Sequence, residues 1–287
     1  MPLRCWPIPF FRALPGPLCL LWLLCPRRYC AAMRIIEADQ VPDVRAGEIP
    51  AHVGVIMDGN GRWAQMRSLT RSEGHAAAEA AVVATVDACL DLGVSWLSAY
   101  AFSTENWTRD EEEVGFLMRF DEWLLRKERR DELDEKGVQI RFLGRTDDPR
   151  IPPASRDWLA ETTALTAGNT RMVLGIAFNY GGRAEIVDAA RRLVAAGVDP
   201  DEVTEASLAA GLYAPDMPDM DLVVRTSSEH RLSNFFPWQS TYAELVFLDT
   251  LWPDFREGHL YSAVAEYQAR RRRMGAASVA SSGPAPA

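Results

Sequence analysis

The segment Asp58-Gly59-Asn60-Gly61-Arg62 carries side chains that could bind a phosphorylated ligand, and it directly follows an apolar run at 53–57. Glycines permit positive φ and let backbone N–H groups approach a ligand closely, which suits a phosphate or diphosphate. Asp58 offers a hard oxygen ligand for Mg²⁺, and Arg62 can make forked hydrogen bonds to phosphate oxygens. A plain Asn-Gly turn with an incidental arginine is the alternative, because a Gly-x-Gly loop is weak evidence on its own.

Arg71 and His75 lie four residues apart across the start of a predicted helix. The N–H groups at a helix start favour anions, so this pair could contribute to the same phosphate site. The alternative is a solvated arginine beside a histidine in a capping region. Closeness in sequence to the glycine loop favours the functional interpretation.

A second polar segment, Ser103-Thr104-Glu105-Asn106-Trp107-Thr108-Arg109, follows an apolar run at 94–102 and precedes a predicted long helix. Its side chains would point into the crevice at the end of a strand. Asn106 offers a donor and an acceptor, Trp107 a flat apolar wall and Arg109 another cation. A loop leading into a helix, with Thr108 as the N-cap, is the alternative and is compatible with a functional role.

Arg225 and Arg231 are six positions apart, with hydroxyl residues between them and Ser233 after them. These donors suit a second diphosphate, although a charged surface turn fits equally well. Glu244 could be a second carboxylate for a metal or a surface residue. Five arginines thus fall at predicted strand ends, and two anionic groups with a cation between them fit this set best: Arg62, Arg71, Arg109, Arg225 and Arg231.

Charge and composition narrow the class of protein. The 287 residues carry a formal net charge of −9, which argues against general nucleic-acid binding because phosphate backbones demand a basic surface. With 48% hydrophobic and 25% charged residues, the composition is that of a globular protein with a substantial core. Any polyanionic ligand must therefore meet a local basic pocket.

Strands and helices are predicted to alternate along the chain, and they must position the residues above. Strands are expected at 53–57, 94–102, 138–143, 171–178, 222–225 and 245–248, and helices at 73–92, 111–136, 153–167, 183–196 and 258–273. This alternation predicts one α/β domain at 48–275, with a mostly parallel twisted sheet flanked by helices on both faces. Ligands of such sheets bind at the carboxyl ends of the strands.

Two terminal segments are expected to lie outside this domain. An N-terminal extension at 1–47 holds four of the five cysteines within its first 32 residues, so the body has only Cys89 and is of reduced, cytosolic type. For residues 1–32 three interpretations stay open: a segment upstream of a true start at Met33, a signal peptide, and a peripheral membrane tether. The tail at 276–287 is rich in Ala, Ser, Gly and Pro and is expected to be disordered.

Blocks spread over nearly all of 48–275 closely resemble the cis-prenyltransferases, the family typified by bacterial undecaprenyl diphosphate synthase. In family order they are residues 52–64, Gly74-His75, residues 100–107, residues 179–183, Arg225-Thr226 with residues 229–235, and Trp238-Gln239 with Tyr242-Ala243-Glu244. The resemblance implies an Mg²⁺-dependent enzyme that condenses isopentenyl diphosphate with an allylic diphosphate, of geranyl or farnesyl type, in Z configuration. It also implies a homodimer and a deep hydrophobic tunnel for the growing chain.

Family roles carry over to the matching positions as expectations. Asp58 would bind Mg²⁺ and assist departure of the allylic diphosphate. Asn106 would assist proton removal from isopentenyl diphosphate; since an amide is too weak a base, it is expected to orient a phosphate oxygen or a water that takes the proton. Glu244 would complete the metal site from the partner subunit. The expected substrate contacts are Gly59, Asn60, Gly61, Arg62, Arg71 and His75 for the allylic diphosphate, Arg225, Arg231 and Ser233 for isopentenyl diphosphate, and Trp63, Ser103, Thr104, Glu105, Trp107, Arg109 and Leu232 as further contacts.

Other activities on this fold stay open. An irregular relative that couples two dimethylallyl units is expected to lose parts of the isopentenyl diphosphate site, and a non-catalytic scaffold subunit to lose Asp58 or its glycine loop. A small Ala101 favours an open tunnel and a long product, the precursor of a lipid carrier, with a short-chain synthase as the alternative. Ser228 stands where the family commonly has glycine and is expected to tune the loop. A cytoplasmic location is expected, with peripheral membrane contact during product release left open.

Overall fold

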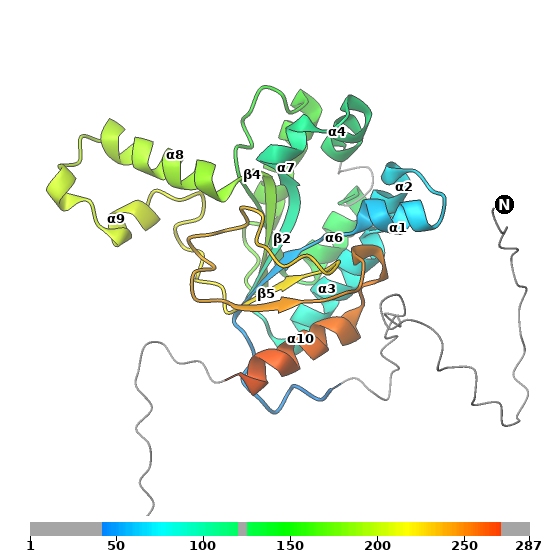
Figure 1. Ribbon diagram of the computed structural model, residues 1–287. Coiled ribbons are helices and arrows are strands. Elements are labelled where there is room, and N and C mark those ends of the chain that lie inside the picture. Colours follow the sequence, from blue (N-terminus) through cyan, green and yellow to red (C-terminus); the bar gives the residue numbers. More distant parts are fainter. Residues whose placement is uncertain (1–41, 120–124, 271–287) are drawn as a thin grey trace, which may run out of the picture. The chain divides into compact units, whose positions relative to one another are not determined.

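Six strands form one parallel sheet within residues 42–119 and 125–270, the part of the chain that the computed structural model describes (Figure 1). They are β1 His52–Ile56, β2 Trp96–Ser103, β3 Val138–Leu143, β4 Met172–Tyr180, β5 Leu222–Arg225 and β6 Glu244–Phe247. Their order across the sheet is β3-β4-β2-β1-β5-β6. The predicted parallel sheet is confirmed, and each expected strand lies within a few residues of its predicted bounds.

Helices connect these strands and cover the sheet. They are α1 Asn60–Met66, α2 Arg71–Ala76, α3 Glu79–Leu92, α4 Glu111–Met118, α6 Lys127–Glu135, α7 Pro153–Thr166, α8 Gly182–Ala195, α9 Glu205–Ala209 and α10 Glu257–Ala269, with short 3₁₀ helices η2 Thr104–Thr108, η3 Pro200–Glu202 and η4 Trp252–Asp254. The sequence predicts neither α1 nor α9. In Figure 1, α8 and α9 extend from one side of the sheet, away from α1 and α2.

The helix expected at 73–92 is wrong in its bounds, because the segment forms two helices. α2 begins earlier, since Thr70 and Glu73 form a capping box in which each side chain accepts from the backbone N–H of the other (3.2 and 2.7 Å). The N–H of Ala78 then bonds to the carbonyl of His75 (3.1 Å), three residues back, so the helix tightens and ends before α3 begins. Alanine-rich sequence favours helix throughout and hides this break.

The single long helix expected at 111–136 is also wrong. α4 ends at Met118, whose carbonyl accepts a hydrogen bond from the hydroxyl of Ser155 on α7 (3.0 Å). α6 begins after Arg126, which has an extended backbone and donates twice to Glu79 (2.8 and 2.9 Å). Such tertiary contacts override a charged pattern that would otherwise continue as helix.

Both faces of the sheet are buried. β1 is buried along its whole length and alternates between them, because Val53 and Val55 join one core cluster and Ile56 joins the other. The larger cluster packs α3, α4, α6, α7 and α10 together with the sheet, and the smaller one contains Phe235 and Phe236 from the connection between β5 and β6. Continuous apolar strands of this kind are typical of parallel sheets covered on both faces.

Gly182, the first residue of α8, leaves no room for a side chain. A Cβ there would lie 1.9 Å from Cδ of Pro237 and 3.0 Å from the carbonyl oxygen of Asn234. We expect Gly182→Ala to lower the free energy of unfolding by about 3 kcal/mol, because the neighbouring connection must shift. Urea unfolding measures the change, with Gly168→Ala as the control because a Cβ at that position meets no atom within 4 Å. Equal effects of the two substitutions would contradict the prediction.

Several predicted segments lie outside the described residues. These are residues 1–41 of the predicted extension, residues 120–124 of the predicted long helix, residues 271–273 of the last predicted helix and the tail at 276–287. Val44, which falls within the predicted extension, is buried against the larger core cluster. The described residues all fall in one compact unit. Within that described part, no helix combines the length and the apolar character needed to cross a membrane.

Candidate active site

The carboxyl ends of the neighbouring strands β1 and β5 frame a crevice. From β1 the chain continues toward β2 and from β5 toward β6, on opposite sides, and such a reversal leaves room for a ligand. Arg225 Nη2 donates to Asp58 Oδ2 at 2.7 Å, and Arg62 Nη2 lies 3.7 Å from Asp58 Oδ1. The Arg225 side chain is 4% exposed and that of Asp58 31%, so the carboxylate is the more accessible partner.

The glycine loop turns the chain from β1 directly into α1. Gly59 has a φ of +110°, and a Cβ there would lie 2.9 Å from the side chain of Leu251. Positive φ is therefore confirmed at Gly59, whereas Gly61 lies inside α1 and has none. Asn60 begins α1, and its Nδ2 lies 3.3 Å from Nδ1 of His75 on α2. The loop thus brings residues predicted for one phosphate site together.

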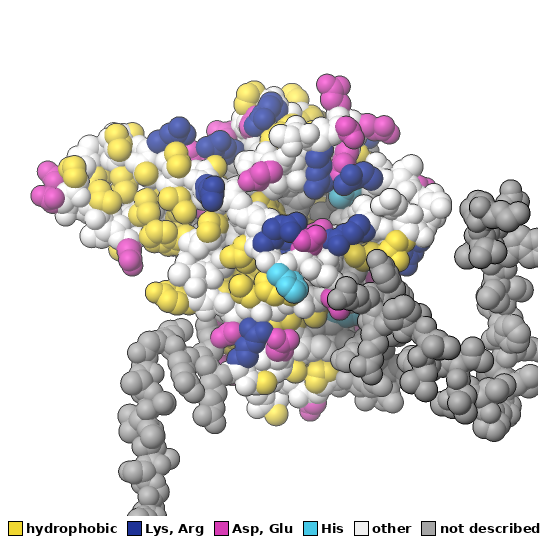
Figure 2. Space-filling view, viewed as in Figure 1, with side chains coloured by type: hydrophobic (Ala, Val, Ile, Leu, Met, Phe, Trp, Pro, Cys, Tyr) yellow, Lys and Arg dark blue, Asp and Glu magenta, His cyan; other side chains and the backbone are white. Residues whose placement is uncertain are grey.

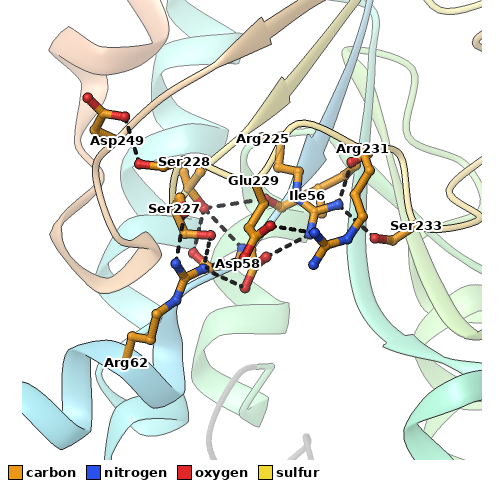
Figure 3. A network of polar contacts seen from close by, with 11 residues as sticks. Ile56, Asp58, Arg62, Arg225, Ser227, Ser228, Glu229, Arg231, Ser233 and Asp249 are labelled. Atoms are coloured by element: carbon orange, nitrogen blue, oxygen red, sulfur yellow. Dashed lines mark hydrogen bonds and ion pairs between the residues drawn. The ribbon is translucent and has the colours of Figure 1, made fainter.

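Charged side chains from the β1–α1 connection, from α1, from the end of β5 and from the loop after β5 form one network (Figure 3). Arg62 contacts the hydroxyl of Ser227 and donates to its carbonyl at 2.9 Å. Arg225 donates to Oγ of Ser233 at 2.7 Å and contacts the carbonyl of Arg231. Residues predicted for two different diphosphates therefore lie side by side around one carboxylate.

A buried carboxylate on α4, Glu113, gathers three of the predicted cationic or imidazole side chains. Arg109 Nη1 donates to it at 2.7 Å, Arg71 Nε lies at 3.2 Å and His75 Nε2 at 3.4 Å. The hydrogen bond with His75, together with the charges of Arg109 and Arg71, lowers the pKa of Glu113 to about 2 against the opposing effect of burial. Sequence reasoning missed Glu113. This residue is the last of an acidic run, and such a run is typical of a solvated helix start. Its spacing of four residues from Arg109 is the signal that could have found it.

The polar segment after β2 folds into η2 rather than an open loop. Oδ1 of Asn106 accepts from the backbone N–H of Ser103 at 2.9 Å, which leaves the amide N–H₂ of Asn106 as its group for a ligand. Thr108 ends η2, and the N-cap of α4 is Asp110, so the alternative role for Thr108 is wrong. Asn106 is thus oriented as a donor.

A cleft of about 750 Å³ lies in front of these groups. It is lined by ten predicted residues: Asp58, Asn60, His75, Ser103, Glu105, Asn106, Arg109, Arg225, Arg231 and Ser233. Tyr100, Arg183 and Asn234 also line it, although sequence reasoning gave them no role beyond their place in the resembling blocks. Figure 2 shows Lys and Arg side chains interspersed with Asp and Glu across the middle of one face.

Three of the predicted substrate contacts make structural contacts beside the cleft. The indole N–H of Trp63 donates to Asp254 Oδ1, and that of Trp107 to Asn179 Oδ1, each at 2.8 Å. Leu232 packs against the smaller core cluster. Trp107, predicted as an apolar wall, is not among the residues that line the cleft. The lining also lacks five other predicted contacts, Gly59, Gly61, Arg62, Arg71 and Thr104.

Glu244 lies far from Asp58 within one chain. It begins β6 and pairs in register with Leu222 at the start of β5, whereas Asp58 contacts the residue at the end of β5. Its carboxylate accepts from Arg270 Nη1 at 2.9 Å. A metal role for Glu244 therefore requires a second chain, as the resemblance implies, and it stays a prediction.

A narrow apolar cavity adjoins the polar cleft. Its lining comes from α3, α6, β2 and β4 and is mainly aliphatic. Met57 and Ala101 line both the cleft and the cavity. A cation-rich cleft beside an apolar cavity suits a ligand with an anionic head and a hydrocarbon tail.

Comparison with known proteins points to the same class. The family model described as "Putative undecaprenyl diphosphate synthase" matches residues 56–275. "Isoprenyl transferase 2" of Corynebacterium glutamicum is 51% identical over 242 residues, which cover 83% of this chain and 98% of that protein. "Trans,polycis-polyprenyl diphosphate synthase ((2Z,6E)-farnesyl diphosphate specific)" of Thermobifida fusca is 52% identical over 240 residues, which cover 82% and 84%.

A solved structure shows that the fold is also similar to that of a known prenyl diphosphate enzyme. Lavandulyl diphosphate synthase from Lavandula x intermedia, in complex with dimethylallyl diphosphate, matches with a TM-score of 0.75 and 35% identity, over 79% of this chain and 98% of that one. The chain therefore belongs to the cis-prenyltransferase family, the family of undecaprenyl diphosphate synthases, and the resemblance in its motifs is confirmed.

Proposed function

We propose that this protein is a Z-prenyl diphosphate synthase that joins isopentenyl diphosphate to an allylic diphosphate and repeats the step to make a long polyprenyl diphosphate, a lipid-carrier precursor. The observation that carries the proposal is the adjoining polar cleft and apolar cavity, which share Met57 and Ala101. A diphosphate head and a growing hydrocarbon need these two environments side by side. Relatives named as isoprenyl and polyprenyl transferases support it.

Two diphosphates bind side by side in this proposal. The allylic diphosphate lies near Arg62 and the cluster of Arg71, His75 and Arg109, and isopentenyl diphosphate lies near the loop after β5, at Arg225, Arg231 and Ser233. The C=C of isopentenyl diphosphate attacks C1 of the allylic partner, whose diphosphate leaves with the bonding electron pair, and one proton is then lost. The arginines stabilise the charge that develops on the departing diphosphate. Asn106 donates through its N–H₂ to a phosphate oxygen or water that receives the proton.

In this proposal, Mg²⁺ binds together with the diphosphate substrate and is not held by protein ligands alone. Asp58 contributes a carboxylate to the cleft, and no group of three His, Cys, Asp or Glu suited to a metal occurs in residues 42–119 and 125–270. Mg²⁺ is commonly held by one or two carboxylates plus substrate phosphates, so this donor set fits it. When bound there, Mg²⁺ would neutralise charge on the diphosphate.

The length of the product can be measured in elongation assays. We expect labelled isopentenyl diphosphate to be incorporated with C10 or C15 allylic primers into products much longer than C20, because the small side chain of Ala101 lies where the cleft meets the apolar cavity and does not block chain growth. Incubation with C5, C10, C15 and C20 primers, followed by sizing of the products, measures this. A product no longer than C15 would sink the long-chain assignment.

The irregular alternative rests on the similarity to lavandulyl diphosphate synthase, at 35% identity. An enzyme of that type would consume dimethylallyl diphosphate alone. Arg225, Arg231 and Ser233 form a connected set in the cleft, which favours a separate site for isopentenyl diphosphate. A coupled product formed without isopentenyl diphosphate would favour the alternative.

A homodimer and a membrane-facing release step complete the proposal. Glu244 would serve the metal site of the partner subunit, since it cannot reach Asp58 in its own chain. Analytical ultracentrifugation tests for the dimer. The enzyme would act in the cytoplasm and touch a membrane surface peripherally when its apolar product leaves.

A further inference from the structure

Two consecutive serines follow the end of β5 in a backbone conformation that favours glycine. Ser227 has a φ of +79° and Ser228 a φ of +58°. In this region the Cβ of other residues crowds the backbone, so non-glycine residues persist where the surroundings hold them. Strained residues of this kind gather at functional sites. The contacts of each serine side chain therefore decide whether its conformation serves the site.

The two hydroxyls have different surroundings (Figure 3). Ser227 is 1% exposed, and its hydroxyl contacts Arg62 Nη2 while its carbonyl accepts from Arg62 Nη1 at 2.9 Å. Ser228 is exposed, and its hydroxyl donates to Asp249 at 2.7 Å. Of the two serines, only Ser227 therefore contacts an arginine beside Asp58.

The backbone behind Ser227 is held firmly. Its N–H bonds to the carbonyl of Thr250 at 2.8 Å, and the N–H of Ser228 bonds to the carbonyl of Leu248 at 2.9 Å. The two oxygens that Ser227 presents to Arg62 are consequently fixed in space. One residue with this φ offers both its carbonyl and its hydroxyl to a single guanidinium.

Arg62 is held at the boundary between the two proposed diphosphate sites. Its Nη2 lies 3.7 Å from Asp58 and 3.8 Å from Glu229, and Glu229 also contacts Arg231. Without the Ser227 hydroxyl, the guanidinium would keep one neutral partner and be drawn toward these two carboxylates. Its presentation to a diphosphate would then change.

We propose that Ser227 is a positioning residue whose hydroxyl and carbonyl together fix Arg62 for the allylic diphosphate. The inference rests on the proposed function, because that function assigns Arg62 to the allylic substrate. In this inference, Ser228 has no positioning role. A purely structural loop would instead tolerate loss of either hydroxyl equally.

Paired substitutions separate these possibilities. Ser227→Gly and Ser228→Gly both place glycine where φ is positive, so both variants are expected to fold; Ser227→Ala and Ser228→Ala remove the hydroxyl without adding backbone freedom. We expect both Ser227 variants to raise the KM for farnesyl diphosphate at least threefold, with the KM for isopentenyl diphosphate within twofold of wild type. Both Ser228 variants should match wild type in both constants.

A binding measurement tests the role of Ser227 without depending on chain elongation. Calorimetric titration with farnesyl diphosphate, without isopentenyl diphosphate, should show at least threefold weaker binding to Ser227→Ala than to Ser228→Ala. Equal affinities would overturn the role of Ser227 even if the enzyme elongates chains normally. An inactive wild-type enzyme that still shows the difference in binding would overturn the proposed function and leave the role of Ser227 standing.

Discussion

Replacing Asp58 by alanine is expected to lower kcat for chain elongation about a thousandfold, the scale on which one lost transition-state contact acts. Asp58 is the carboxylate of the cleft that contacts arginines from both proposed diphosphate sites, through Arg225 at 2.7 Å and Arg62 at 3.7 Å. It is also the proposed ligand for the Mg²⁺ that accompanies the substrate. Its loss removes the metal ligand and leaves two cations without their shared partner.

The fold should survive this substitution. Arg225 keeps its hydrogen bond to Ser233 and its contact with the carbonyl of Arg231, so its buried guanidinium retains partners. Circular dichroism and gel filtration check folding, and single-turnover incorporation of labelled isopentenyl diphosphate measures the chemistry. Asp249→Asn is the matched control, because that exposed carboxylate receives a hydrogen bond outside the cleft. Turnover of Asp58→Ala within tenfold of wild type would refute the role.

Replacing Glu113 is expected to damage both substrate affinity and stability. Glu113 is 6% exposed and contacts Arg71, His75 and Arg109, so its loss leaves the two guanidinium groups without the carboxylate between them and removes one hydrogen bond of His75. Glu113→Ala should raise the KM for the allylic diphosphate at least tenfold and lower the free energy of unfolding by about 2 kcal/mol, the scale of a lost hydrogen bond to a charged group, because Arg71 and Arg109 remain in contact with water. Steady-state kinetics and urea unfolding measure the two effects.

Glu112→Ala is the control for this residue. Glu112 is exposed on the same turn of α4, so its substitution tests the effect of one lost negative charge without the three contacts. Similar KM values for the two variants would contradict a special role for Glu113.

Acid should weaken the stabilisation that Glu113 provides. Its pKa is lowered from 4.5 to about 2 in the folded protein, so the folded state holds the carboxyl ionised where the unfolded chain begins to bind a proton. The contribution is therefore complete above pH 4.5 and is lost as pH falls toward 2. The difference in unfolding free energy between wild type and Glu113→Gln should shrink between pH 5 and pH 2.5. A difference that stays constant over that interval would count against the depressed pKa.

The sheet and the two clusters of donors that we propose to bind diphosphates could be predicted from sequence because their signals are local. Short apolar runs that end in polar motifs mark strand ends, and strand ends of a parallel sheet converge. The Asp58 loop and the Arg225 loop were predicted on this basis, and β1 and β5 do bring them together.

Features that depend on contacts between distant segments escaped prediction. The break after α4 is accompanied by a hydrogen bond from Ser155, which lies 37 residues further along. Glu113 looks like a solvated residue until α2 is packed against α4. Trp107 was expected to face the ligand, but its indole N–H donates to Asn179, 72 residues away. No local periodicity carries information of this kind.

The position of β5 beside β1 also governs when the site can form during folding. β1 and β2 are joined by one local connection, whereas Asp58 and Arg225 are 167 residues apart in sequence. Bringing the two ends of so long a segment together costs conformational entropy before their contacts can compensate for it, and pairing of parallel strands far apart in sequence is slow. The amino-terminal strands can therefore pair while the ribosome is still making the chain, but the cleft is completed only after β5 has been synthesised. The active site therefore forms late in the folding of each newly synthesised chain.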